Sequence, residues 1–216
     1  MKAGKMVQKG PLHTTQAVHT EPGLLQKWFA SDGQFHQLYP ESVRAQANMH
    51  WTPLHVARKA AEFLTADKHK RILDIGSGGG KFCLAAAYYC PEGIYTGIEQ
   101  RASLVANAEE ANRVLGLAHV SFLHQNILDT DLASYDHFYF FNAFYENLDD
   151  SFRIDESLTY SRELYAQYNR HLFRQLEKKP PGTRIVTFHS TENEMPGNYM
   201  EVSVSADELL KCWIKV

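Results

Sequence analysis

An acidic residue and three glycines stand at alternate positions after a short apolar run in this chain of 216 residues. The run reads RILD and closes on Asp74, and the glycines are Gly76, Gly78 and Gly80. A strand that ends in a glycine turn lets the backbone approach a ligand that any Cβ atom would block. Helix-forming residues, KFCLAAAYY, follow at once. The sequence of strand, glycine turn and helix favours binding of a nucleoside-containing cofactor.

The spacing of these glycines distinguishes three known loops. A P-loop needs a glycine where Ile75 stands and a Ser or Thr in place of Phe82. The dinucleotide fingerprint G-x-G-x-x-G, started at Gly76, needs a glycine in place of Lys81. What remains is the pattern acid-x-G-x-G-x-G, for which a purely structural turn is the alternative interpretation.

A carboxylate ends the next apolar run, EGIYTGIEQ, at Glu99. This residue lies about 20 positions beyond the glycine turn, so we expect it at the tip of the neighbouring parallel strand, where it can accept hydrogen bonds from ribose hydroxyls. A solvated glutamate at a strand end is the alternative. The two features together strengthen the prediction of a nucleoside site.

The glycine pattern resembles motif I of the class I S-adenosylmethionine (SAM)-dependent methyltransferases. That resemblance implies SAM as the cofactor. It also implies a polar side chain near the adenine amino group and an apolar one against the adenine ring, for which Asn126 and Ile127 stand in VSFLHQNILD. An Asx turn at Asn126 and a surface role for Gln100 are the alternatives. The predicted cofactor-binding residues are Asp74, Gly76, Ser77, Gly78, Gly80, Glu99, Gln100, Asn126, Ile127 and Asn142.

The segment DHFYFFNAFYENLDD is expected to end beside the cofactor, and its end resembles the N-P-P-Y motif of amine-directed methyltransferases at Asn142 and Tyr145. Ala143 and Phe144 replace the two prolines. By this resemblance Asn142 is the predicted catalytic residue, accepting the hydrogens of a target nitrogen and turning its lone pair toward the methyl group. Alternatively, Asn142 caps the strand, and Phe144 and Tyr145 pack against a helix.

Two further segments bear on the substrate. The loop after this strand contains Glu146 and four other acids around a single Arg153, so we expect it to favour a cationic acceptor such as a lysine side chain or a small amine. Trp51, in HWTP, resembles a residue that folds over the methionine part of SAM. A solvated loop and ordinary core packing are the respective alternatives. The predicted substrate residues are Trp51, Tyr145 and Glu146. For Lys81 we expect a head group in water and no chemistry.

Composition excludes several classes of protein. The net charge of −3 and pI near 6.4 make a nucleic-acid partner the less favoured one. Three cysteines without a C-x-x-C pair favour a reducing cytoplasm, and the scattered histidines predict no metal site. No run of 18 apolar residues occurs, so no membrane partner is expected.

Alternating apolar runs predict the fold. Strands are expected at 71–75, 93–98, 119–124 and 136–142, with helices at 79–89 and 101–115 between them. A later helix around 164–176 precedes the strand TRIVTFHS, and NYMEVSVS and KCWIKV suit an antiparallel edge pair. The predicted fold is α/β, a doubly wound, mostly parallel seven-stranded sheet with that antiparallel C-terminal pair and N-terminal accessory helices.

We expect residues 1–22 to form a flexible arm and 23–216 a single SAM-binding domain, with residues 23–70 as a helical cover. Within this cover, LLQKWFA and SVRAQANMH are expected helices, and Thr52 is expected to cap a helix that starts at Pro53. The predicted function is methyl transfer from SAM to a nitrogen of a protein side chain or small amine. The alternative is a non-catalytic SAM-binding module that regulates or scaffolds a partner.

Overall fold

The computed structural model describes residues 22–190, 195–205 and 209–216. The predicted flexible arm, residues 1–22, lies outside this range except for Pro22, with which the first helix begins. Within the described residues, no helix is both long and apolar enough to traverse a lipid bilayer.

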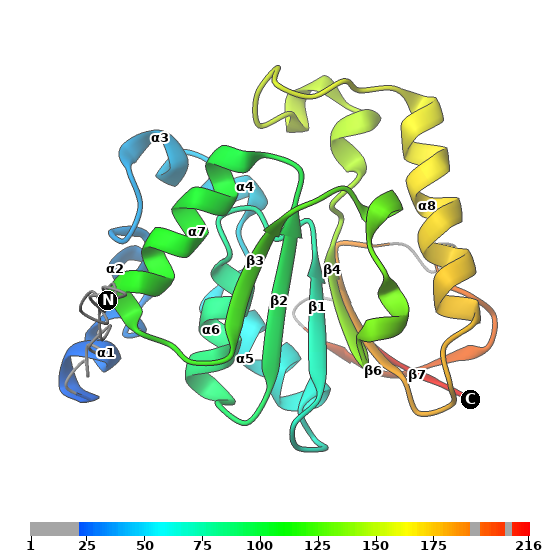
Figure 1. The fold of residues 1–216 in the computed structure, drawn as a ribbon, viewed down its shortest axis with the longest axis horizontal. Coiled ribbons are helices and arrows are strands. Elements are labelled where there is room, and N and C mark those ends of the chain that lie inside the picture. The colour runs from blue at the N-terminus through cyan, green and yellow to red at the C-terminus, as the bar shows by residue number, and fades with distance from the viewer. Residues whose placement is uncertain (1–21, 191–194, 206–208) are drawn as a thin grey trace, which may run out of the picture.

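Seven strands form one sheet in the order β3-β2-β1-β4-β5-β7-β6 (Figure 1). The first five pair in parallel, and β7 pairs antiparallel with both β5 and β6. The predicted fold class is thereby confirmed. The strands are β1 (Arg71–Ile75), β2 (Ile94–Glu99), β3 (Val120–His124), β4 (His137–Phe141), β5 (Arg184–Phe188), β6 (Tyr199–Ser205) and β7 (Leu210–Lys215).

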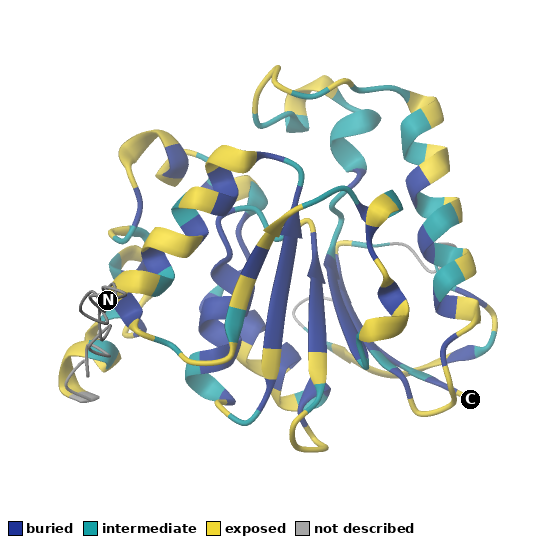
Figure 2. Ribbon diagram, viewed as in Figure 1, coloured by how far each residue is buried: buried dark blue, intermediate teal, exposed yellow. Residues whose placement is uncertain are grey.

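Helices cover both faces of the sheet because adjacent strand residues point to opposite sides. On one side Ile72 packs in a core with α5 (Leu54–Leu64), α6 (Lys81–Tyr89) and α7 (Ala102–Leu115). On the other side Leu73 packs in a second core with α8 (Arg162–Glu177). The strands at the centre of the sheet are buried on both faces (Figure 2). Four 3-10 helices complete the second side: η1 (Ile127–Asp129), η2 (Leu132–Ser134), η3 (Tyr145–Asn147) and η4 (Asp150–Phe152).

The N-terminal cover contains four short helices, α1 (Pro22–Trp28), α2 (Asp32–His36), α3 (Glu41–Arg44) and α4 (Ala47–His50). The single helix expected over SVRAQANMH is therefore wrong, since the chain forms two helical turns there. Phe35 and Val43 anchor this cover in the first core. Short amphipathic turns held by a few buried side chains do not need a continuous helix.

The predicted cap of α5 is also wrong. The Thr52 hydroxyl lies 2.9 Å from the hydroxyl of Tyr139 in β4, and the Leu54 N–H donates to the Asp32 carboxylate at 3.1 Å instead. A free helix N–H group can donate to any well-placed oxygen, including one from a distant helix. Asp32 thus links α2 to the start of α5.

Lys81 does not extend into water as expected. Its side chain is 5% exposed, and its ammonium group pairs with Asp32 and lies 3.1 Å from Nε2 of His36. Burial lowers the pKa of Lys81, while the Asp32 carboxylate opposes this effect. The first helix after the glycine turn is therefore held to the N-terminal cover by an ion pair whose lysine is buried and whose aspartate is partly exposed.

Candidate functional site

The main cavity has a volume of about 440 Å³ and opens at the carboxyl ends of the parallel strands. It lies where the sheet order turns from β1 toward β2 on one side and β4 on the other, the place where ligands bind in open α/β sheets. The predicted site residues that line it are Gly76, Gly78, Glu99, Gln100, Ile127, Asn142, Trp51, Tyr145 and Glu146.

The three glycines of the turn have different surroundings, although all have left-handed φ angles of 53° to 82°. A Cβ atom on Gly76 would lie 2.4 Å from Cβ of Ala143, and one on Gly80 would lie 2.5 Å from the Phe122 ring. A Cβ on Gly78 would meet nothing within 4 Å. Gly76 and Gly80 therefore allow close packing of the protein, whereas Gly78 leaves room on the cavity side for a ligand.

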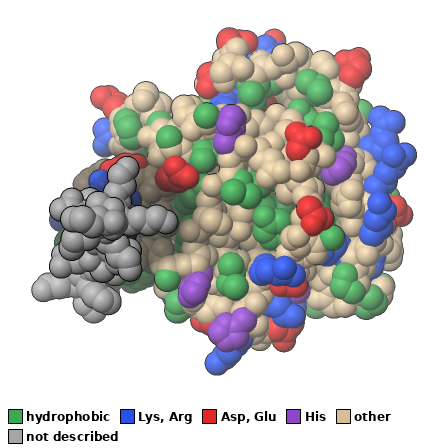
Figure 3. Space-filling model, in the orientation of Figure 1, with side chains coloured by type: hydrophobic (Ala, Val, Ile, Leu, Met, Phe, Trp, Pro, Cys, Tyr) green, Lys and Arg blue, Asp and Glu red, His purple; other side chains and the backbone are tan. Residues whose placement is uncertain are grey.

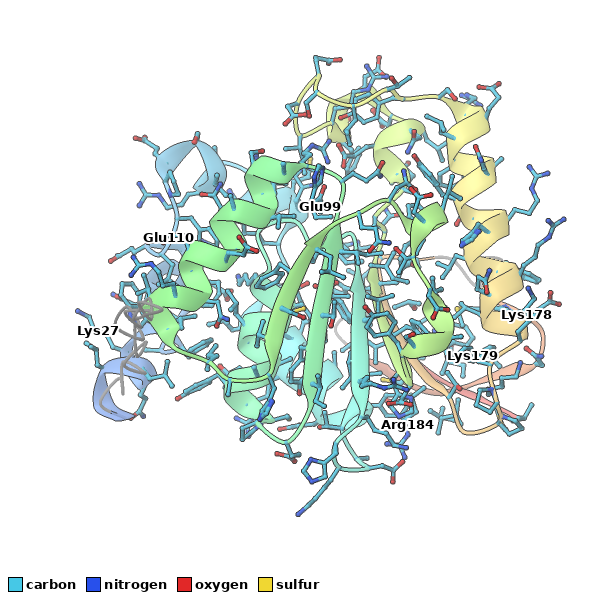
Figure 4. All side chains as sticks on the ribbon, in the orientation of Figure 1. Lys27, Glu99, Glu110, Lys178, Lys179 and Arg184 are labelled. Carbon is cyan, nitrogen blue, oxygen red and sulfur yellow. The ribbon has the colours of Figure 1, made fainter. Side chains whose placement is uncertain are left out.

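Glu99 lies at the carboxyl end of β2 (Figure 4) and faces the glycine turn. Its Oε2 accepts the Gly78 N–H at 3.2 Å, and its Oε1 accepts the Arg101 N–H at 2.9 Å. Burial raises the pKa of Glu99, and the bonds from Arg101 and Gly78 oppose that rise. Since each carboxylate oxygen has two lone pairs, the group retains acceptor capacity toward the cavity.

Asp74 and Ser77 lie behind the turn and line a separate small cavity of about 30 Å³. Burial raises the pKa of Asp74 to about 8, and the Cys83 thiol donates to its carboxylate at 3.6 Å. The buried Ser77 hydroxyl has no hydrogen-bond partner within the described part of the chain. Neither side chain lines the main cavity.

The side chain of Asn126 is engaged within the protein. Its Oδ1 accepts the Leu128 N–H at 2.9 Å, and its Nδ2 donates to Gln100 at 2.8 Å and to Tyr168 at 3.1 Å. The first of these contacts is the Asx turn named above as the alternative. Gln100 and Ile127 line the main cavity on either side of this network.

Arg101 is the central charged residue of the site and was not predicted. Its guanidinium lies 3.5 Å from Glu99, 2.5 Å from Glu146 and 3.2 Å from Asp155, and its side chain is 3% exposed. It also donates to Tyr160 at 2.6 Å. Burial lowers the pKa of Arg101, but these carboxylates raise it more. Two carboxylates of the acidic loop, Glu146 and Asp155, thus pair with one cation beside the cavity.

Two histidines also line the cavity without having been predicted, His50 at the end of α4 and His189 directly after β5. Burial lowers the pKa of each. Phe141 and Phe188 are register partners in β4 and β5, so Asn142 and His189 follow side by side. Both have left-handed φ angles, 42° and 56°. Such angles in non-glycine residues concentrate at functional sites, and they offer no signal in the sequence.

Trp51 is buried between the cavity and the N-terminal cover. Its ring contacts Tyr39 at a centroid distance of 4.7 Å and His36 at 4.9 Å. It lines both the main and the small cavity. The Trp51 side chain therefore both packs against the N-terminal cover and lines the main cavity.

A second groove follows α8 and differs in charge from the main cavity. It is lined by Arg170, Arg174 and Lys178, and Figure 3 shows Lys and Arg side chains gathered at that edge of the molecule. None of these three cations forms an ion pair with another described residue. No glycine turn or buried carboxylate accompanies them.

The fold and the glycine–carboxylate site together define a Rossmann-like methyltransferase. A family model described as a methyltransferase domain matches residues 66–214, and the chain belongs to this family within the class I SAM-dependent methyltransferase superfamily. The cofactor of this superfamily is SAM. Among curated proteins no sequence match is found.

Solved structures show the same fold at low sequence identity. TrmN from Thermus thermophilus is 16% identical with a TM-score of 0.56, over 81% of this chain and 52% of that one. A mutant of MtNAS in complex with S-adenosylmethionine is 12% identical with a TM-score of 0.54, over 88% of this chain and 70% of that one. The chain spans about half the length of the first solved structures that it matches.

Proposed function

We propose that this protein transfers a methyl group from SAM to a nitrogen atom of a protein side chain or a small amine. The observation that carries the proposal is the contact between the Gly78 N–H and the Glu99 carboxylate at the wall of the main cavity. It brings a glycine backbone N–H together with a carboxylate that can accept hydrogen bonds from ribose hydroxyls. These are the two requirements of a nucleoside site.

The residues at the cavity wall fit SAM. The open space at Gly78 would admit the ligand against the backbone, and the remaining lone pairs of Glu99 would accept its ribose hydroxyls. Ile127 presents an apolar surface for a purine ring, and Gln100 an amide beside it. When bound, the cofactor supplies a methyl group on a positively charged sulfur that an in-line nucleophile can displace.

The acceptor is proposed to lie beside Asn142. No hydrogen bond engages the Asn142 amide within the described residues, so its oxygen can accept from the N–H groups of a target nitrogen. The Tyr145 ring lines the same wall and packs edge-on against Phe152 at 4.9 Å. Methyl transfer requires this alignment more than it requires an activated protein nucleophile.

A non-catalytic SAM-binding module is the second candidate. Its support is Phe144, which replaces a proline of the amine-directed motif and packs in the second core against Phe140 and Tyr168. A segment shaped by core packing does not require a substrate.

One pair of experiments separates these functions. Isothermal titration with SAM and with S-adenosylhomocysteine tests the cofactor site. Incubation with methyl-tritiated SAM and fractionated cell lysate tests transfer. We expect binding of both compounds and label in a protein or small-molecule fraction. Binding without label in any fraction would favour the module, and absence of binding would contradict both candidates.

A further inference from the structure

The carboxylates that face the main cavity are not free to receive a cationic acceptor. Among the described residues that line it, the acids are Glu99 and Glu146, and both pair with Arg101. Glu146 also accepts the Ile154 N–H at 3.1 Å. An alkylammonium group entering this space would therefore have to compete with the buried Arg101 guanidinium for these carboxylates.

Aromatic rings instead form the wall beyond Asn142. The His189 ring stacks on Phe141 at a centroid distance of 5.3 Å and meets Phe188 edge-on at 4.4 Å. Phe141 and Phe188 are themselves 4.8 Å apart. Such a wall suits a flat, uncharged ring, which stacks or packs edge-on with aromatic side chains.

The imidazole of His189 is available to a ligand. Neither ring nitrogen forms a hydrogen bond with the described residues, while the His189 backbone N–H is fixed to Leu209 at 3.0 Å. The side chain lines the cavity and is also exposed to solvent. A proton taken from a bound molecule can therefore pass on to water. Partial burial lowers the pKa of His189, which favours the neutral imidazole.

The backbone at His189 has a cost that a glycine would avoid. Its φ of 56° matches those of His69 and His119, which are exposed and lie just before β1 and β3 at the opposite edge of the sheet. Of these three histidines, only His189 lines the cavity.

We propose that His189 is the catalytic base of this methyltransferase and that its acceptor is an uncharged amine attached to an aromatic ring. This inference rests on the proposed function and names the substrate class of the same site. An aromatic amine is weakly basic, so it reaches the cavity with its lone pair free. The Asn142 amide would orient its N–H groups, and the rings of Phe141 and Phe188 would hold its aromatic part.

The proton and electron balance of the step is closed. The nitrogen lone pair forms the new N–C bond as the C–S bond breaks, and the bonding electrons remain on sulfur, which loses its positive charge. The nitrogen becomes strongly acidic as the N–C bond forms, because an arylammonium ion is a much stronger acid than an alkylammonium ion. One of its protons therefore moves to the free nitrogen of His189 during the methyl-transfer step, and the imidazolium then releases that proton to water.

The test uses the full-length protein, methyl-tritiated SAM and three separated cell fractions: small molecules, RNA and protein. These arms distinguish a free aromatic amine from an aromatic amine carried by a polymer. We expect label in the small-molecule fraction, whereas label confined to RNA would contradict a free amine as the acceptor. Label confined to lysine in the protein fraction would overturn the substrate class.

The base is tested with His189→Gly, with His119→Gly as the control for removing a left-handed histidine. We expect His189→Gly to bind SAM normally and to lose at least about 100-fold in labelling rate. Added imidazole should restore much of that rate. His119→Gly should label like the wild type and shift the melting temperature by a similar amount.

Unchanged labelling by His189→Gly, or a loss that imidazole does not restore while His50→Gln abolishes labelling, would overturn the assignment to His189. Either result would leave the proposed function standing because the wild type still transfers label. SAM binding without any labelling by the wild type would instead overturn both.

Discussion

The carboxyl ends of β1 and β2 and those of β4 and β5 form opposite walls of one cavity, but their polar groups are used differently. On the first wall, the carboxylate of Glu99 is bonded to the Gly78 N–H and to Arg101. On the second, the side chains of Asn142 and His189 form no hydrogen bond with the described residues, and both backbones are strained. The first wall is fixed before any ligand binds, whereas the second leaves its polar side chains for the ligand.

The proposed function accounts for this difference. A cofactor of constant shape is bound well by groups held in place beforehand, because little order remains to be imposed on binding. An acceptor that must be aligned and must lose a proton needs side chains whose bonding capacity is unused. Substitutions on the two walls should therefore separate cofactor affinity from turnover.

Among substitutions compared at one pH, the largest effect is expected within the glycine turn. Gly80→Ala should lower the free energy of unfolding by about 4 kcal/mol, because its Cβ would overlap the Phe122 ring at a left-handed φ. Gly78→Ala is the matched variant, with the same strain but no overlap, and should lose about 1 kcal/mol. Urea unfolding measures both.

SAM titration completes this comparison. Gly78→Ala should lose cofactor affinity although it remains folded, because its methyl group enters the ligand space. Equal unfolding free energies for the two variants would contradict the distinction between a packing glycine and a ligand-facing one.

A pH-dependent effect concerns Asp74, which lies behind the first wall. Burial raises its pKa to about 8 in the folded protein, from an ordinary value of 3.8. The stability that protonated Asp74 contributes is therefore fully present below about pH 4 and is lost as the pH rises through 8. Relative to Asp74→Asn, the wild type should lose about 6 kcal/mol of unfolding free energy over that interval. Parallel stability curves for the two proteins would show that Asp74 ionises normally.

Glu99→Ala should weaken SAM binding by about 2 kcal/mol because it leaves the ribose hydroxyls and the Gly78 N–H without their acceptor. Glu110→Ala, on the exposed side of α7, is the control and should bind SAM like the wild type (Figure 4). Isothermal titration calorimetry measures the SAM affinity of both variants, and wild-type affinity in Glu99→Ala would refute the ribose assignment.

The smallest effect is expected for Glu146→Gln on the acceptor side. Arg101 keeps Glu99 and Asp155 as partners, and the new amide oxygen still accepts a hydrogen bond, so the loss of unfolding free energy should be about 1 kcal/mol. SAM affinity should change little, while the concentration of the acceptor-containing fraction needed for half-maximal methyl transfer should rise. A drop in SAM affinity as large as that of Glu99→Ala would show that the two walls are coupled through Arg101.

Local pattern predicted the fold and the first wall. The strand ends, the glycine turn and the Glu99 carboxylate are encoded within about 30 contiguous residues, where hydrophobic periodicity and turn chemistry are readable. The alternation of strands and helices predicted the mostly parallel sheet, the resemblance to the methyltransferase superfamily implied its seven strands and antiparallel final pair, and the structure supplied the strand order.

The contacts between residues far apart in the sequence, and His189 on the second wall, could not be predicted in this way. Arg101 meets Glu146 and Asp155 across 45 and 54 positions of sequence, and no local pattern joins them. The same holds for Lys81, whose partner Asp32 lies 49 residues earlier. His189 was hidden because its preceding strand gives no sign of the left-handed turn that follows.

The pairing of Asp32 with Lys81 and with the first N–H of α5 sets a lower limit on the independently folding unit. The family match begins at residue 66, beyond the whole of α5. A fragment that begins at residue 66 would remove the ion-pair partner of Lys81 and expose the apolar face of α6 that packs against α5. It would also remove the residues between 46 and 53 that line the main cavity. Residues 22–64 are thus part of the structural framework, and any minimal folded version of this protein must retain them.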